Sequence, residues 1–190
     1  RLDAANVSWA WYAGAWQIAL DQGKELSHIA FQYHHQPFNY YANYAPGKPA
    51  RAEHLRDGGM DGAKLIADID AGKLPQVTFY KPQGNLNQHA GYANIAAGDA
   101  HIADVIAHLE KSPQWQHMLV VVTYDENGGW WDHVAPPKGD RWGPGLRIPT
   151  IIVSPFAKRG YVDHTQYDTG SIQRLINRRF GLAPLPGIEQ

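Results

Sequence analysis

The hydrophobic positions of the chain predict a series of β-strands. Residues 7–12 alternate, with Trp9 and Trp11 on one face and Ala10 and Tyr12 on the other, which is the period of a strand. Three further β-branched or apolar runs also predict strands, at 77–80, 118–123 and 150–153. The run 118–123 is uninterrupted, which is typical of a parallel strand buried on both faces.

Apolar residues at helical spacing predict helices at 60–71, 94–111 and 169–180. Asp168 and Gly181 are the expected caps of the last of these helices. The segment 23–57 lacks a clear period and is predicted to be a long irregular loop, of a length that is usually functional. The order of strand, helix and strand indicates an α/β fold, a three-layer sandwich with a mostly parallel sheet.

Composition narrows the class of protein. The chain has 190 residues, with 17 Lys and Arg against 18 Asp and Glu, so no net positive charge favours binding to nucleic acid. The 44% hydrophobic content argues against disorder, and no apolar run approaches the roughly 18 residues that a transmembrane segment requires. Because the chain contains no cysteine, it has no disulfide, no thiolate zinc site and no cysteine nucleophile.

Two adjacent carboxylates, Asp125 and Glu126, directly follow the predicted buried strand. In open α/β sheets, ligands bind beyond the carboxyl ends of the strands, so a site is expected here. Carboxylate oxygens on the tight turn that Asn127, Gly128 and Gly129 supply suit a divalent cation. The alternative is a capped turn with Glu126 in solvent.

Three histidines lie in the two long loops. His34 and His35 are bracketed by Tyr33 and Phe38 in the first loop, and His89 belongs to the second. Imidazoles can ligate a metal, donate a hydrogen bond to a phosphoryl oxygen or act as the general acid for a leaving alkoxide. The alternative is a structural role, with each ring bonded to backbone carbonyls.

Weaker candidates follow the acidic turn. Asp132 and His133 form either an orienting carboxylate–imidazole pair or the cap of a turn. The glycines of 139–145 match no phosphate-loop pattern, so we expect a rigid loop in which Arg141 contacts an anion at most weakly.

Other polar residues are predicted to have no catalytic role. His101, Asp104 and His108 share a face of the helix expected at 94–111, and we expect that face to be solvated. Ser154 lacks the surrounding glycines of a nucleophile elbow.

Five blocks of sequence together resemble one family. They are FQYHHQPF at 31–38, NQHAGY at 87–92, GDAHI at 98–102, VTYDENGGWWDHV at 122–134 and GDRWGPG at 139–145. In this order they resemble the bacterial phosphoesterase family of phospholipase C and acid phosphatase A enzymes, within the alkaline phosphatase-like superfamily. Since several blocks agree along nearly the whole chain, the resemblance is specific.

The resemblance implies an active site. Asp125 and Glu126 would be ligands of one divalent metal ion, and His34, His35 and His89 would surround the phosphoryl group and assist the leaving oxygen. The implied reaction is metal-dependent hydrolysis of a phosphate monoester or a phospholipid through a phosphoenzyme. The aromatic residues Trp130, Trp131 and Trp142 would either form a wall of the substrate site or belong to the core.

The family's nucleophilic serine or threonine and its remaining metal ligands belong to an N-terminal half without a counterpart in residues 1–190. We therefore expect 1–190 to be the C-terminal part of one phosphoesterase catalytic domain, an incomplete alkaline phosphatase-like fold without its nucleophile. Its expected partner is the N-terminal part of the same enzyme. The alternative is a non-catalytic fragment or a module that binds phosphate or a partner. The resemblance also implies a periplasmic or secreted location.

Overall fold

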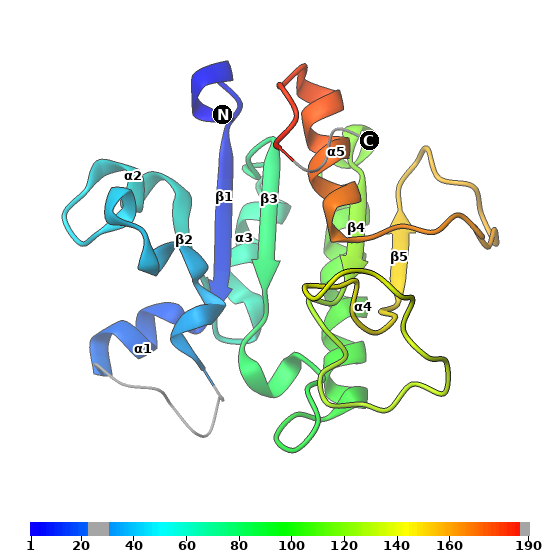
Figure 1. The fold of residues 1–190 in the computed structure, drawn as a ribbon. Coiled ribbons are helices and arrows are strands. Elements are labelled where there is room, and N and C mark those ends of the chain that lie inside the picture. Colours follow the sequence, from blue (N-terminus) through cyan, green and yellow to red (C-terminus); the bar gives the residue numbers. More distant parts are fainter. Residues whose placement is uncertain (23–30, 187–190) are drawn as a thin grey trace. The chain divides into compact units, whose positions relative to one another are not determined.

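The structure is a computed structural model that describes residues 1–22 and 31–186 (Figure 1). The chain divides into two compact units, Ser8–Trp115 and the combination of Arg1–Val7 with Gln116–Gln190. Nothing in the described residues is a helix long and apolar enough to cross a membrane.

A parallel sheet of three strands forms the centre of the Ser8–Trp115 unit. β1 (Trp9–Gly14) lies between β2 (Leu55–Gly59) and β3 (Val77–Lys81) (Figure 1). Trp11 of β1 is in register with Leu55 of β2 and with Phe79 of β3. The strands predicted at 7–12 and 77–80 are therefore confirmed, and the predicted mostly parallel α/β sheet is present in this unit.

Helices and aromatic side chains cover the two faces of this sheet. The α-helices of the unit are α1 (Trp16–Gln22), α2 (Pro49–His54), α3 (Ala63–Asp70) and α4 (Ile95–Lys111). On one face the Tyr12 hydroxyl donates to Asp68 of α3 at 2.6 Å. On the other, Trp9 stacks on His54 of α2, with ring centroids 4.1 Å apart. The sheet thus lies between two layers, as expected for a three-layer α/β fold.

The segment 23–57 is more regular than predicted. Its described part contains α2, β2 and short 3₁₀ helices at Tyr33–His35, Pro37–Tyr40 and Ala42–Tyr44, while residues 23–30 lie outside the described residues. The prediction of an irregular loop was wrong here because each element is only a few residues long. β2 also has the sequence Leu-Arg-Asp-Gly-Gly, which lacks β-branched residues.

The polar face predicted on α4 is not solvated along its whole length. His101 is 8% exposed, and its Nε2 lies 2.8 Å from the Tyr80 hydroxyl. Burial lowers the pKa of His101 from its ordinary value. His108 instead lies 2.7 Å from Asp70 of α3. The prediction failed at His101 because β3 supplies a hydroxyl partner that helical spacing alone cannot show.

The second unit contains an antiparallel pair, β4 (Val120–Thr123) and β5 (Thr150–Val153). Both strands were predicted, but the expectation that the first is parallel and buried was wrong, since no residue of β4 falls in the buried class. An apolar run predicts a strand without fixing the direction of its partner. α5 (Thr169–Phe180) is confirmed with both predicted caps, because Asp168 forms a capping box with Ser171 and Gly181 adopts a left-handed conformation.

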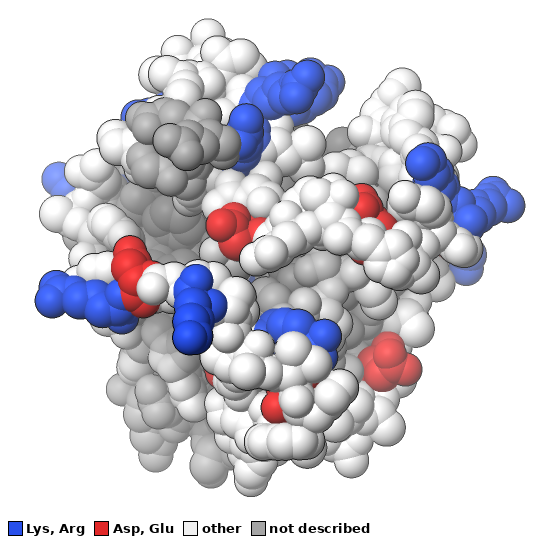
Figure 2. Space-filling view, turned by 45° about the vertical axis from the view of Figure 1, so that its right-hand side comes forward, with Lys and Arg blue, Asp and Glu red and all other residues white. Residues whose placement is uncertain are grey.

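The described residues contain four further 3₁₀ helices of three residues each. They are Asp3–Ala5, Trp115–His117, Met60–Gly62 and Gly84–Leu86. On the face drawn in Figure 2, both basic and acidic residues lie among uncharged ones.

Candidate active site

The carboxylates Asp125 and Glu126 lie in the bend that follows β4. Both residues are exposed, and Oε2 of Glu126 accepts a hydrogen bond from the Gly128 N–H at 2.7 Å. Gly128 and Gly129 have φ angles of 62° and 79°, a conformation that favours glycine. The two glycines thus turn the chain away and leave both carboxylates at the end of the strand.

His34 and His35 belong to the 3₁₀ helix Tyr33–His35, and their rings are perpendicular with centroids 4.8 Å apart. His35 is only 3% exposed, whereas His34 is in the exposed class. The Trp11 indole N–H donates to the His35 carbonyl at 2.9 Å, and the buried Gln36 amide donates to the Trp11 carbonyl at 3.3 Å. The histidine pair is therefore anchored to the central strand, with His34 accessible to a ligand.

His89 is held in the separate loop that follows β3. Its Nδ1 lies 2.8 Å from the Ala90 carbonyl, and its backbone N–H donates to the Asn87 side chain at 2.9 Å. Because a carbonyl can only accept, the proton of this hydrogen bond is on Nδ1. The ring also stacks on Tyr92, with centroids 4.9 Å apart. The loop thus fixes the orientation of the imidazole.

Asp125 and Glu126 are the described residues whose chemistry could contribute to a metal site. Asp125 and Glu126 are hard oxygen donors of the kind that divalent cations such as Mg²⁺ bind, and they fit the metal that the resemblance implies. Across the described ranges, no group of three or more His, Asp or Glu side chains is placed to hold one ion. Since Mg²⁺ is bound by about six ligands, further groups must complete the shell.

Asp132 is paired with an arginine that the sequence did not reveal. Nε and Nη2 of Arg147 donate to the two carboxylate oxygens of Asp132, each at 2.8 Å, and the Val134 N–H also donates to Asp132 at 3.0 Å. The hydrogen bonds from Arg147 hold the pKa of Asp132 well below its usual range. Nδ1 of His133 is 3.6 Å from Asp132, and its side chain is 76% exposed. Asp132 thus caps its turn, and its carboxylate lies closer to Arg147 than to His133.

Arg141 and Trp142 lie together in the glycine-rich loop. The Arg141 guanidinium is 4.3 Å from the centroid of the Trp142 ring, and the Trp142 N–H donates to Asp140 at 2.8 Å. Trp131 and Trp142 are 86% and 80% exposed, and Trp130 is 46% exposed. These tryptophans are therefore surface residues in the structure and do not belong to the core of the described residues.

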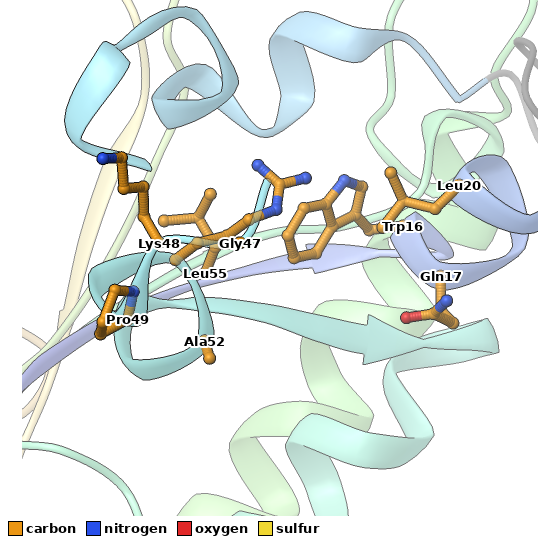
Figure 3. A pocket seen from close by; sticks show the side chains of 9 residues that line it. Trp16, Gln17, Leu20, Gly47, Lys48, Pro49, Ala52 and Leu55 are labelled. Atoms are coloured by element: carbon orange, nitrogen blue, oxygen red, sulfur yellow. The ribbon is translucent and has the colours of Figure 1, made fainter. Parts of the chain in front are cut away.

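A depression between α1 and α2 in the Ser8–Trp115 unit was not predicted from the sequence. In Figure 3, Trp16, Gln17 and Leu20 approach it from α1, while Lys48, Pro49 and Ala52 lie on the opposite side. Arg51 and Leu55 also line it. The available signals were the four-residue spacing of two apolar side chains in α1 and the proline at the first position of α2.

The parallel sheet with its covering helices belongs to the α/β class. Members of this class bind ligands beyond the carboxyl ends of their strands, and the histidines lie in loops that follow strands of this sheet. The model of the Phosphoesterase family matches residues 1–183, and the chain belongs to this family.

Relatives of the chain carry phospholipase C names. It is 28% identical to "Non-hemolytic phospholipase C" of Pseudomonas aeruginosa, over 96% of this chain and 29% of the relative. It is 31% identical to "Non-hemolytic phospholipase C" of Burkholderia pseudomallei, over 75% of this chain and 25% of the relative. It is 32% identical to "Non-specific phospholipase C6" of Arabidopsis thaliana, over 63% of this chain and 29% of the relative. The chain thus spans less than a third of the length of these relatives.

Proposed function

We propose that the protein containing this chain is a metal-dependent phosphoric ester hydrolase of the phospholipase C or acid phosphatase type. The observation that carries the proposal is the match of the Phosphoesterase family model to residues 1–183, which includes every candidate site residue. The phospholipase C names of the relatives support a phospholipid as the substrate. A phosphate monoester is proposed on the resemblance to acid phosphatases alone.

In this proposal Asp125 and Glu126 hold one divalent metal ion, which polarises the phosphoryl oxygens when bound. The exposed His34 imidazole donates a proton or a hydrogen bond to the leaving oxygen. The ring of the buried His35 contacts the His34 ring and fixes its position. As an imidazolium, His89 contributes a second donor to the phosphoryl group through Nε2, since its Nδ1–H is already bonded to the Ala90 carbonyl. The orientation of its ring by Ala90 and Tyr92 supports such a role.

We further propose that the reaction proceeds through a phosphoenzyme whose nucleophile lies outside residues 1–190. The greater length of the relatives leaves room for that nucleophile and for the missing metal ligands. The partner of this chain would then be the N-terminal part of the same enzyme. A periplasmic or secreted location completes the proposal, on the resemblance to exported enzymes.

A second candidate is a non-catalytic module that binds phosphate or a partner chain. The observation that favours it is that the described residues lack a group of three metal-ligating side chains. Hydrolysis of p-nitrophenyl phosphate and phosphatidylcholine, measured together with metal content, separates the two candidates. The full-length protein should be active and the 190-residue chain inactive. A full-length protein that is inactive and metal-free would refute the hydrolase proposal.

The role of His34 has its own test in the full-length protein. His34→Gln should lower kcat about 10²-fold, as expected for the loss of a general acid. His117→Gln is the matched control, because His117 is exposed in a different unit. Equal activity of the two variants would exclude His34 from the reaction.

A further inference from the structure

The depression between α1 and α2 places a positive charge beside an apolar wall. Trp16, Leu20 and Leu55 form apolar parts of its lining, and Lys48 and Arg51 are its charged residues. Among the described residues, its lining contains no serine, threonine, histidine or carboxylate. The depression is therefore suited to binding rather than to hydrolysis.

Arg51 is one of the two charged residues that line this depression. Its Nη1 donates to the Asn39 side chain at 3.1 Å and to the Tyr44 carbonyl at 2.8 Å. Its guanidinium carbon lies 4.9 Å from the centroid of the Trp16 ring. These contacts fix the plane of the guanidinium through one of its nitrogens. Within the described residues, Nε and Nη2 have no acceptor, so one edge of the fork is available to a ligand.

The charge of Arg51 is not balanced by the residues around it. Both of its hydrogen-bond acceptors are neutral, and none of the described carboxylates pairs with it. Burial lowers the pKa of Arg51 from its ordinary value, because desolvation disfavours the charged form. A cation that has lost part of its hydration without gaining a counter-charge favours an anionic ligand.

We propose that this depression binds an oxyanion that carries an apolar chain. The Nε and Nη2 edge of Arg51 matches two oxygens of a phosphate or a carboxylate, which arginine binds through parallel hydrogen bonds. Lys48 adds a second positive charge at the rim. The apolar chain lies against Leu20, which is 38% exposed, whereas Trp16 and Leu55 are buried core residues at the base of the depression. The site is distinct in composition from the acidic turn at Asp125, and it lies wholly within the Ser8–Trp115 unit.

The test is isothermal titration calorimetry of the full-length protein with hexylphosphonate, which phosphoesterases cannot hydrolyse. Titrations in an Asp125→Asn background remove the contribution of the proposed metal site. Hexylphosphonate should bind more tightly than inorganic phosphate or 1-hexanol, because only hexylphosphonate has both an oxyanion for Arg51 and an apolar chain for the apolar part of the lining. Arg51→Met should weaken binding about tenfold or more, as expected for a lost charged hydrogen bond.

Two further variants keep the test decisive. Ala52→Trp adds bulk to an exposed position of the lining and should also weaken binding about tenfold, by exclusion and without removing charge. Arg174→Met removes an exposed arginine of α5 and should leave binding unchanged. Equal affinities for Arg51→Met and Arg174→Met would overturn the proposal. So would unchanged binding in Ala52→Trp, which also decides the question if Arg51→Met fails to fold.

Vesicles separate two sources of such a ligand. Flotation with phosphatidic acid vesicles should capture the wild-type protein more than Ala52→Trp if the oxyanion belongs to a membrane lipid. Equal flotation, together with tight hexylphosphonate binding, would assign the site to a soluble amphiphile. If Asp125→Asn loses hydrolytic activity but still binds hexylphosphonate, the depression binds its ligand independently of the proposed active site.

Discussion

The hydrogen bond from Trp11 to His35 makes a testable link between the core and the candidate active site. Trp11→Phe removes the indole N–H that donates to the His35 carbonyl at 2.9 Å. It keeps an aromatic ring against Phe79, whose centroid is 5.4 Å away. The substitution therefore isolates the polar contact that anchors the turn of His34 and His35.

The expected cost follows from this contact. Removing one partner of a part-buried hydrogen bond costs about 1–3 kcal/mol, and the smaller ring adds a packing loss, so we expect the free energy of unfolding to fall by about 2 kcal/mol. Since the turn is also less constrained, kcat of the full-length enzyme should fall. Urea denaturation followed by far-UV circular dichroism measures the first effect, and hydrolysis of p-nitrophenyl phosphate measures the second.

Trp131→Phe is the matched control, because Trp131 is 86% exposed. Its free energy of unfolding should change by less than about 0.5 kcal/mol. If Trp11→Phe were as stable as this control and as active as the wild-type enzyme, the anchoring of the histidine pair by Trp11 would be refuted. A loss of stability with unchanged kcat would show instead that the histidines need no such anchor.

Three other predictions concern stability. Burial raises the pKa of the Tyr12 hydroxyl to about 12. The hydroxyl should therefore stabilise the fold fully below pH 10, and this contribution should be lost as the pH rises towards 12. Tyr12→Phe should flatten this alkaline loss of stability in thermal unfolding. Asp168→Ala should cost about 1 kcal/mol in urea denaturation by removing the N-cap of α5, and Asp168→Asn should restore most of it. Gly14→Ala should cost about 1–3 kcal/mol, because an added Cβ meets the Gln83 backbone; unchanged unfolding would contradict the close approach.

Features that depend on neighbouring residues in the sequence could be predicted. The alternation around Trp9 and Trp11 predicted β1, and the two caps of α5 were found because Asp168 and Gly181 act on the chain next to them. The position of Asp125 and Glu126 directly after a strand was also predictable, since it follows from the order of the sequence alone.

Features that depend on distant partners could not be predicted. The direction of β4 is decided by β5, which returns after a long loop, and Arg147 reaches Asp132 across the same loop. Burial of His101 depends on the Tyr80 hydroxyl of another element. The period of hydrophobic residues does not show which residues that are distant in the sequence form contacts with one another.

In the candidate site, too, features of the local sequence could be predicted and features that depend on distant partners could not. The sequence identified His34 and His35 as a pair, but only the structure distinguishes an exposed His34 from a buried His35 held by Trp11. The depression around Arg51 was missed because α1 and α2 are too short for a clear helical period.

The most direct test of the central proposal is the metal content of the full-length Asp125→Asn variant, determined by elemental mass spectrometry alongside turnover of phosphatidylcholine. Glu110→Gln, an exposed change on α4, is the control. If Asp125 is a ligand of a catalytic metal ion, metal content and turnover should fall together, each about tenfold or more, while the control keeps both. Unchanged metal content and turnover in Asp125→Asn would contradict the account.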